Sequence, residues 1–428
     1  MNGGLSMVEM KSGYKMTEVG VIPEDWEVCE LRNHLVLLTD YDANGSFADM
    51  ASNVVTTTGN GYAWYVRATD LEQQSSLSEV KYVDEKSYRF LRKSTLYGGE
   101  VLLAKRGEIG KVYYFQMKTK RATLAPNLYL LKLKDTINSY FLFSLFKSTF
   151  GQNLLKSINA STSLGAIYKD DVKGLNILIP PFEEQASIAT ALSDVDSLIS
   201  ALTKKIEKKK AIKQGLMQQL LTGKKRLPGF CGDWIKKNVS SVSDIFRGGS
   251  PRPIENYIVK SGGVNWIKIG DVDSSAKYIF RTNEQIIESG IQYSRFVHSG
   301  DLLLSNSMSF GRPYILKTEG CIHDGWLVIQ NYDKYFDKEF LYYLLGSDEV
   351  LKQYKSLAAG SSVLNLNKDI VGKVVLYFPP SISEQTAIAN ILSDCDSEIV
   401  ALEEKRDKYK EIKQGMMQQL LTGKIRLI

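Results

Sequence analysis

The chain has 428 residues, of which 54 are Lys or Arg and 48 are Asp or Glu, so its formal net charge at neutral pH is +6. This length is typical of two or more compact domains, and 43% hydrophobic with 24% charged residues excludes a disordered polypeptide. The apolar runs are far shorter than the ~20 residues that cross a bilayer, and the polar first fifteen residues lack a signal-peptide core. We therefore expect a cytoplasmic protein without a membrane span.

Cysteine and histidine spacing argues against a metal site. The four cysteines show no C-x-x-C spacing and the three histidines are scattered, so neither a zinc site nor a disulfide framework is predicted. The glycine-rich patterns that cradle phosphates are also missing from the sequence. We expect a non-catalytic chain that binds no cofactor of its own.

Residues 20–179 form the first predicted domain. Short runs of β-branched and aromatic residues are bounded by Gly, Asn and Asp, which is typical of strands joined by turns. A helix is expected near Tyr140–Phe150. The segment is therefore predicted to be a mixed α/β (α+β) domain rich in strands.

Residues 180–223 predict one long helix. Pro180 and Pro181 block a helix upstream, and Gly223 lies where this one would end. Its apolar seam is interrupted at Lys209 and is expected to resume at Ile212. The steps of four and three are those of a heptad seam, and the residues are Ile188, Leu192, Val195, Ile199, Leu202 and Ile206.

Residues 224–378 and 379–428 repeat this order as a second globular segment and a second helix. The globular part again reads as strands with a helix near Glu339–Gly346. Ser381 and Glu384 have capping-box spacing, Gly423 lies at the expected helix end, and Ile412 is expected to resume the seam. The second seam consists of Ile388, Leu392, Cys395, Ile399 and Leu402.

An internal duplication explains this order. Residues 184–227 and 384–427 are identical at 29 of 44 positions without a gap. The two globular segments also resemble each other, but less closely than the helices do. The sequence that follows the first helix resembles the C-terminal segment of the chain followed directly by the N-terminal segment. We predict two globular domains that alternate with two long helices, paired as an antiparallel coiled coil in a pseudo-two-fold symmetric molecule.

The repeated motifs identify a family. An apolar strand, Pro-Pro, Glu-Gln, I-A-x-x-L-S-D-x-D and K-Q-G-x-M-Q-Q-L-L-T-G-K-x-R-L each occur twice. This arrangement resembles the specificity subunit of type I restriction-modification systems over nearly the whole chain. The resemblance implies that 20–179 and 224–378 are target recognition domains, each reading half of a split, asymmetric double-stranded DNA target. It also implies that 180–223 and 379–428 are spacer helices.

The same resemblance implies the partners. Two methyltransferase subunits and restriction (translocase/endonuclease) subunits would carry the chemistry and use S-adenosylmethionine, ATP and Mg²⁺, while this chain is non-catalytic. The Pro-Pro pairs follow Ile179 and Phe378, so the Asn or Asp of an adenine methyltransferase motif is missing there. The glycines inside the helices indicate a close helix or subunit approach. The predicted docking residues are Gly215, Gly415, Gln218 and Gln418.

Candidate DNA contacts lie in loops that occupy matching places in the two globular segments. Glycines allow a close backbone approach, Arg and Lys suit phosphates or guanine, and Asn suits adenine. Solvated polar turns are the alternative interpretation. The candidates are Arg67, Lys105, Arg106, Lys111 and Ser161 in the first segment, and Lys268, Asn306, Arg312 and Ser361 in the second.

Two alternatives stay open on the sequence. The duplicated helices could organise partner proteins as a scaffold or adaptor that reads no DNA. Separately, the lysine-rich run 204–213 of the first helix could face solvent, dock a subunit or contact phosphate.

Overall fold

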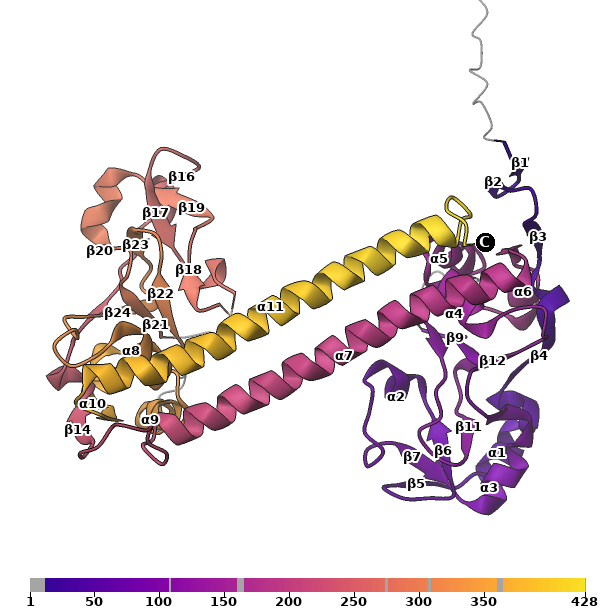
Figure 1. The fold of residues 1–428 in the computed structure, drawn as a ribbon, viewed down its shortest axis with the longest axis horizontal. Coiled ribbons are helices and arrows are strands. Elements are labelled where there is room, and N and C mark those ends of the chain that lie inside the picture. Colours follow the sequence, from indigo (N-terminus) through magenta and orange to yellow (C-terminus); the bar gives the residue numbers. More distant parts are fainter. Residues whose placement is uncertain are drawn as a thin grey trace, which may run out of the picture. The chain divides into compact units, whose positions relative to one another are not determined.

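A computed structural model describes residues 12–107, 109–159, 165–273, 276–306, 309–359 and 365–427, and the chain forms two compact units. Unit 1 comprises the described residues up to Leu202 together with those from Lys405 onward, and unit 2 comprises those within Thr203–Glu404. Each unit thus combines one β-rich domain with a half of each long helix (Figure 1). The predicted boundaries at the helix ends remain predictions, because these units divide the helices themselves.

Unit 1 contains two larger sheets that share a core. The four-stranded sheet is antiparallel with order β10-β9-β12-β4, and the five-stranded sheet has order β5-β7-β6-β11-β8 with one parallel pair, β6 and β11. The strands of the first are β4 (Leu35–Asp40), β9 (Val101–Ala104), β10 (Val112–Tyr114) and β12 (Leu128–Leu133). Those of the second are β5 (Thr56–Thr58), β6 (Ala63–Val66), β7 (Lys81–Val83), β8 (Thr95–Leu96) and β11 (Ala122–Leu124).

Small elements complete unit 1. Strand β3 (Glu27–Glu30) pairs antiparallel with β13 (Asn176–Ile179), and β1 (Tyr14–Thr17) forms a hairpin with β2 (Gly20–Pro23). The helices are α1 (Phe47–Asn53), α2 (Ala68–Glu72), α3 (Glu85–Phe90), α4 (Ser139–Lys147), α5 (Thr149–Ser157) and α6 (Lys169–Lys173). The helix expected near Tyr140–Phe150 is therefore confirmed as α4, followed by the start of α5.

Strand β9 shows why the short apolar runs form sheets. Val101 and Leu103 belong to the core that includes α4 and the long helices, whereas Leu102 and Ala104 belong to the core under the five-stranded sheet. Successive side chains of a strand point to opposite faces, so a strand covered on both faces is apolar throughout. The run Val-Leu-Leu-Ala needs no polar alternation for this reason.

Unit 2 repeats the topology with a different sequence and one additional strand, β18, which pairs parallel with β22. Its sheets have the orders β15-β24-β21-β22-β18 and β16-β19-β17-β23-β20, and β17 and β23 are again parallel. Leu302 and Leu304 face the helix-side core while Leu303 faces the other, as in β9. The predicted diverged duplication is confirmed. In chain order, the strands of these two sheets are β15 (Asp244–Arg247), β16 (Ile258–Val259), β17 (Val264–Ile267), β18 (Tyr278–Ile279), β19 (Glu284–Ile286), β20 (Arg295–Val297), β21 (Leu302–Ser305), β22 (Pro313–Leu316), β23 (Gly320–Ile322) and β24 (Trp326–Gln330).

The remaining elements of unit 2 match those of unit 1. Strand β14 (Ile235–Asn238) pairs with β25 (Val375–Phe378) as β3 pairs with β13. The helices are α8 (Lys338–Leu345), which confirms the helix expected at Glu339–Gly346, then α9 (Asp348–Ala358) and α10 (Lys368–Lys373).

Both long helices are confirmed, as α7 (Phe182–Leu220) and α11 (Ile382–Leu420), each of 39 residues. Gly223 and Gly423 follow their ends with φ of 68° and 70°, the left-handed conformation that favours glycine after a helix. Neither α7 nor α11, nor any other helix in the described ranges, is long and apolar enough to span a membrane.

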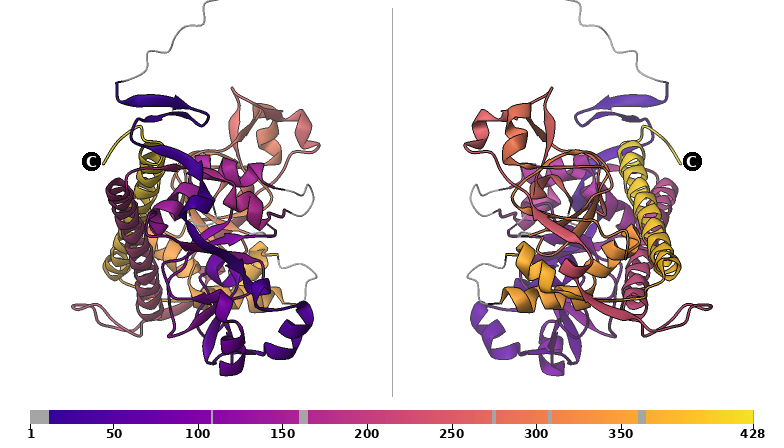
Figure 2. Two further views of the ribbon diagram at one scale, coloured as in Figure 1. Left: turned by 90° about the vertical axis from the view of Figure 1, so that its right-hand side faces the viewer. Right: turned by 90° about the vertical axis from the view of Figure 1, so that its left-hand side faces the viewer.

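The halves of α7 and α11 pack antiparallel within each unit (Figures 1 and 2). In unit 1, Ile188 and Leu192 share a core with Leu420 and Leu421. In unit 2, Ile388 and Leu392 share a core with Leu220 and Leu221, the same four positions 200 residues apart. The predicted heptad seam is confirmed at its buried positions, which are Ile188, Leu192, Leu202 and Ile206 of α7 and Ile388, Leu392 and Ile399 of α11.

The seam does not resume where we predicted. Ile212 and Ile412 are 43% and 41% exposed, so that part of the prediction is wrong. Ion pairs hold the helices at this level instead: Lys213 lies 2.5 Å from Asp396 in unit 2, and Lys413 lies 2.6 Å from Asp196 in unit 1. A long lysine side chain reaches a carboxylate on the neighbouring helix where an isoleucine would need a buried partner.

The expected close approach of helices at the internal glycines is also wrong. A Cβ atom built on Gly215 or Gly415 would meet nothing within 4 Å, because both face open space. Approach of another subunit at these glycines remains a prediction.

A cluster that we call the end clasp links the end of one long helix to the start of the other in each unit. In unit 1, Arg426 donates two hydrogen bonds of 2.7 Å to Glu184 and one of 2.7 Å to Asp25. In unit 2, Arg226 donates to Glu384 at 2.6 and 2.7 Å. The N-terminal and C-terminal segments thus combine to make in unit 1 what one continuous segment makes in unit 2, which confirms the predicted circular continuity.

Candidate nucleic-acid interface

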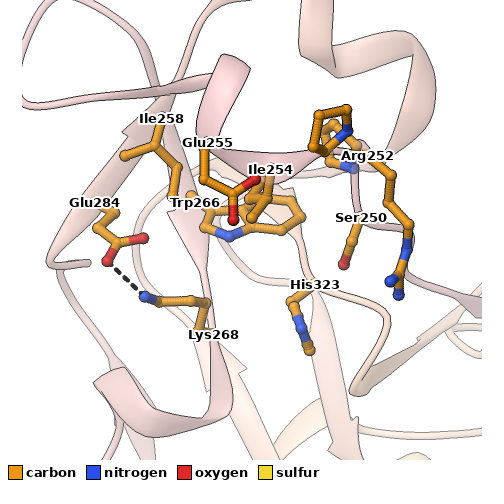
Figure 3. Close-up of a pocket in the computed structure, with 11 residues that line it drawn as sticks. Ser250, Arg252, Ile254, Glu255, Ile258, Trp266, Lys268, Glu284 and His323 are labelled. Carbon is orange, nitrogen blue, oxygen red and sulfur yellow. Dashed lines mark ion pairs between the residues drawn. The ribbon is translucent and has the colours of Figure 1, made fainter.

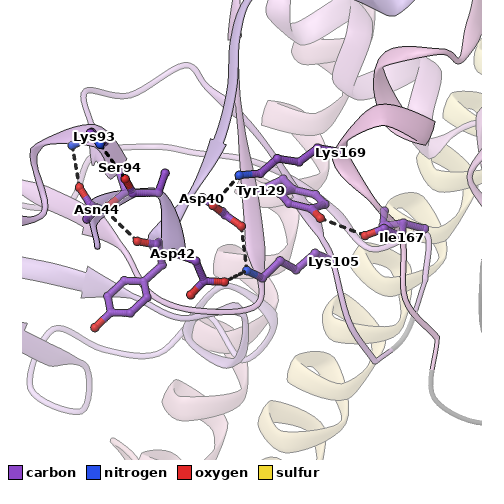
Figure 4. A network of polar contacts seen from close by, with 11 residues as sticks. Asp40, Asp42, Asn44, Lys93, Ser94, Lys105, Tyr129, Ile167 and Lys169 are labelled. Atoms are coloured by element: carbon purple, nitrogen blue, oxygen red, sulfur yellow. Dashed lines mark hydrogen bonds and ion pairs between the residues drawn. The ribbon is translucent and has the colours of Figure 1, made fainter. Parts of the chain in front are cut away.

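The loop that begins at Lys105 is anchored by a polar network in unit 1. The Lys105 side chain is only 9% exposed, and its ammonium donates hydrogen bonds of 2.9 Å to Asp40 and 2.5 Å to Asp42 (Figure 4). Asp40 also accepts a 2.7 Å hydrogen bond from Lys169. The charge of Lys105, a predicted DNA contact, is therefore paired with carboxylates inside the unit.

Charge pairing dominates the electrostatics of this network. Burial acts to raise the pKa of Asp40, but the hydrogen bonds from Lys169 and Lys105 outweigh it and hold that pKa below its ordinary value. Burial raises the pKa of Tyr129, whose ring lies between the two ammonium groups, to about 12. The cluster is thus a neutral, fixed platform of two carboxylates and two ammonium groups.

This platform presents Arg106. The backbone amide of Gly107 donates to the carbonyl of Gly165 at 3.0 Å, and that of Ile167 donates to the carbonyl of Lys105 at 3.1 Å. Both strands of the loop base are therefore tied together beside Asp40. The Arg106 side chain is exposed, and it has no ion pair with another described residue. It is the predicted contact in this loop that can reach a ligand directly.

The other two predicted cations of unit 1 have acidic partners nearby. Lys111 lies 3.0 Å from Glu72, which also accepts a 2.7 Å hydrogen bond from Tyr113. Arg67 holds Asp70 with its Nε and Nη2 atoms, and the hydrogen bonds to that carboxylate raise the pKa of the Arg67 guanidinium. Both cations are about one-third exposed, so each pair can orient a cation toward a ligand.

Unit 2 places different side chains in the same backbone frame. The amide of Lys105 donates to Asn127 and that of Asn306 donates to Gly325, both at 3.0 Å. Where Lys105 reaches Asp40, the amide group of Asn306 is buried and donates a 2.8 Å hydrogen bond to the carbonyl of Asp324. Asn306 is thus engaged within the unit, as Lys105 is.

An open pocket of about 660 Å³ lies beside Lys268 in unit 2 (Figure 3). Trp266 is buried at its base, and Ile254 and Ile258 contribute apolar walls. Lys268 forms a 2.8 Å ion pair with Glu284 across one side. A second hollow of about 440 Å³ continues past Lys268 and His323 toward Gly325, next to the Asn306 loop.

Asp324 is in contact with several polar groups on the other side of the pocket. It accepts a 2.9 Å hydrogen bond from Ser250, the Nε2 atom of His323 lies 2.9 Å from the same carboxylate oxygen, and Arg252 lies 3.5 Å away. Burial acts to raise the pKa of Asp324, but Ser250 and the neighbouring cations outweigh it and lower that pKa. Arg252 is largely exposed and is one of the residues that line the pocket.

The polar cluster around Asp324 was not predicted from the sequence. The run Arg-Gly-Gly-Ser-Pro-Arg-Pro at 247–253 carries the signal, since its glycines and prolines indicate an irregular, surface-lying segment with two arginines. The guanidinium of Arg247 donates a 3.0 Å hydrogen bond to the carbonyl of Asp324. Asp324 itself stands 74 residues after Ser250, so no local pattern predicts their contact.

The remaining candidates fall into three groups. Arg312 is partly exposed, with its guanidinium 5.8 Å from the ring centre of Tyr314. Ser161 and Ser361 lie outside the described residues. Gln218 and Gln418 are exposed near the ends of α7 and α11.

Metal ligation is not supported in the part of the chain that the structure describes. No group of three or more His, Cys, Asp or Glu side chains there could hold a metal ion.

Comparison with known proteins decides the family. Residues 23–214 and 232–414 match the family described as "Type I restriction modification DNA specificity domain". The chain belongs to this family. It is the specificity subunit that recognises DNA for a type I restriction-modification complex, and it is the non-catalytic part of that enzyme. The alternative of a scaffold that reads no DNA is thereby set aside.

Two relatives from Methanocaldococcus jannaschii span nearly the whole specificity subunit. One, provisionally named the type I restriction enzyme MjaX specificity subunit, is 28% identical over 97% of this chain and 97% of its own length. The type I restriction enzyme MjaVIII specificity subunit is 25% identical over 95% of this chain and 94% of its own length.

Solved structures share the fold. The type I restriction-modification S subunit from M. genitalium has a TM-score of 0.59 at 14% identity, covering 92% of this chain and 96% of its own. A chain solved in work on complex assembly and conformational transition of a type I system has a TM-score of 0.57 at 16% identity, covering 94% and 99%. The specificity subunit therefore has the fold of these proteins.

Proposed function

We propose that each unit reads one half of a split, asymmetric DNA target, with 20–179 and 224–378 as the two target recognition domains. One observation carries the proposal: the two domains share a strand order but place different side chains at equivalent backbone positions. Lys105 and Asp40 in unit 1 correspond to Asn306 and Arg247 in unit 2. A shared frame with different donors suits two different half-sites.

In unit 1 we assign the direct contact to Arg106. It is exposed and held at its base by the Asp40 network, so its guanidinium can meet a phosphate or the paired acceptors of guanine. Arg67 and Lys111 are supporting contacts, each oriented by an acidic partner. Lys105 positions the loop, and we expect it to act through Arg106. Ser161 belongs to the same proposed surface.

In unit 2 we assign contacts to the pocket rim. Arg252 is exposed and His323 is partly exposed, and both surround Asp324 next to Lys268. Such a mixture of cations and hydrogen-bonding groups suits the binding of DNA phosphates at the pocket rim and of the edges of bases within the pocket. Arg312 and Ser361 extend this surface, and Asn306 supports it from below.

We propose that the helices dock the partners. Gly215 and Gln218 recur as Gly415 and Gln418, and all four positions are at least partly exposed. Two methyltransferase subunits would bind there, one for each repeat, and restriction (translocase/endonuclease) subunits would complete the complex. S-adenosylmethionine, ATP and Mg²⁺ would be bound by those partners, and the assembly would act on DNA in the cytoplasm.

Methylation mapping of the host genome tests this function. Deletion of the gene should abolish methylation at one split motif, and replacing residues 20–179 with the same segment of a relative should change one half of that motif only. A matched exchange of 224–378 should change the other half. Loss of no motif on deletion would contradict DNA reading, and a change in both halves on one exchange would contradict separate readers.

A further inference from the structure

A groove of about 500 Å³ lies in unit 1 between the start of α5 and the end of α11. Four lysines line it and no carboxylate does, and its floor includes Met417 and the amide side chains of Gln414 and Gln418. These two amides make no hydrogen bond with another described side chain. The lysines are Lys147, Lys410, Lys413 and Lys424.

Unit 2 has a smaller groove at the equivalent place. It measures about 260 Å³, and Gln214, Met217 and Gln218 of α7 form the same floor. Its rim differs, because the start of α9 contributes Asp348 and Glu349. Two lysines and two carboxylates line this groove, so its charge is balanced where that of unit 1 is strongly positive.

Asp348 shows what the repeated floor binds. Its carboxylate accepts a 2.7 Å hydrogen bond from Gln214 and a longer one of 3.4 Å from Gln218. The corresponding residue in unit 1 is Thr149, since each follows the serine that caps its helix, Ser148 or Ser347. Unit 2 thus fills the amide donors with a carboxylate of its own, and unit 1 leaves them available.

We propose that the groove of unit 1 binds a carboxylate-bearing segment of the methyltransferase partner, and that Asp348 blocks the same contact in unit 2. This rests on the proposed docking function and deepens it. The two partner copies are then bound unequally: one by its acidic segment through Gln414, Gln418 and the lysines, the other without that contact. Hydrogen bonds from amides and ammonium groups to a carboxylate are among the stronger polar contacts.

The floor favours a protein partner over DNA. The floor of the unit 1 groove consists of Met417 and the uncharged amides of Gln414 and Gln418. Methionine and uncharged amides suit a protein segment, whereas a DNA phosphate would use the lysines. The lysines of unit 1 alone would suit either one.

Two reciprocal variants test the inference in the full chain. Thr149→Asp places in unit 1 the carboxylate that unit 2 already has, and Asp348→Thr removes it from unit 2. An acidic residue in the first turn of a helix is favourable, so Thr149→Asp should fold. The measurement is titration with the methyltransferase subunit of the same system, followed by native mass spectrometry, with hydrogen exchange showing which groove is protected first.

The expected results differ in sign. With the wild-type chain, partner below one equivalent should protect residues 410–424 before 214–224. Thr149→Asp should weaken the first binding step about 10-fold or more, and Asp348→Thr should strengthen the second about 10-fold, the size of one charge-assisted hydrogen bond. Ser157→Asp is the matched control, with the same charge on α5 roughly 12 Å farther on, and should change neither step.

Other outcomes overturn the inference in distinguishable ways. Unchanged binding by both variants, or first protection of 214–224, would refute the unequal grooves while leaving partner docking intact. Weaker DNA binding by Thr149→Asp without partner, with partner binding unaltered, would show that the groove takes phosphate. No binding of methyltransferase to the wild-type chain would overturn the docking function itself.

Discussion

The end clasp allows a paired stability test, because the chain carries two versions of it. Glu184 and Glu384 have side chains that are each only 1% exposed, and each pairs with one arginine through both carboxylate oxygens. Arg426→Ala removes the cation in unit 1 and Arg226→Ala removes it in unit 2. Each change leaves a buried carboxylate without its charge partner.

The two losses should differ in size. Removing one partner of a buried ion pair typically costs about 3–5 kcal/mol. Glu184 keeps a 2.9 Å hydrogen bond from the Trp26 indole and a 3.3 Å one from the Leu427 amide. Among the described residues the indole nitrogen of Trp234 has no hydrogen-bond partner, so Glu384 lacks the first of these. We expect about 3 kcal/mol for Arg426→Ala and about 5 kcal/mol for Arg226→Ala.

Hydrogen exchange and thermal unfolding measure these effects unit by unit. At about 2–4 °C per kcal/mol for units of this size, Arg226→Ala should lower the Tm by roughly 10–20 °C and Arg426→Ala by roughly 6–12 °C. Increased exchange should be confined to the unit that carries the change, and Lys208→Ala, on an exposed face of α7, should alter neither value. Losses below about 1 kcal/mol, or a larger loss for Arg426→Ala, would refute the reasoning.

Three further predictions concern the reading domains and the clasp. Arg106→Ala should weaken DNA binding and reduce the slope of its salt dependence by about one charge, which a salt titration of DNA binding measures. Lys105→Ala should instead lower the free energy of unfolding of unit 1, which an unfolding experiment measures. Since the Asp40 pKa is held below 3.8, its pairing stabilises unit 1 above that pH and is lost as the pH falls below it, so Asp40→Asn should flatten the acid limb of a stability-versus-pH curve. Trp26→Phe should cost about 1 kcal/mol more than Trp234→Phe in urea unfolding, because only Trp26 donates a hydrogen bond; equal losses would contradict this.

The sequence by itself determined the long helices and the duplication. Heptad spacing, the prolines before each helix and the glycines after Leu220 and Leu420 are local signals, and local signals predict a helix and its ends. The repeat at an offset of 200 supplies a second helix with the same apolar seam. Because an apolar seam must be covered, the two helices were predicted to pair antiparallel. The motifs also sufficed for the family, and Ile212 and Ile412 were misplaced only because spacing cannot tell a seam from a neighbouring face.

Only the tertiary structure decided which cations are available for binding. Lys105 stands beside Arg106 in the sequence, yet Asp40, 65 residues earlier, buries the charge of one and leaves the other exposed. Asp348 likewise meets Gln214 across 134 residues. Charge pairing depends on which segments distant in the sequence come into contact, and neither composition nor periodicity predicts those contacts. Helices and strands follow from local patterns for the opposite reason: their periodicity is a property of the chain itself.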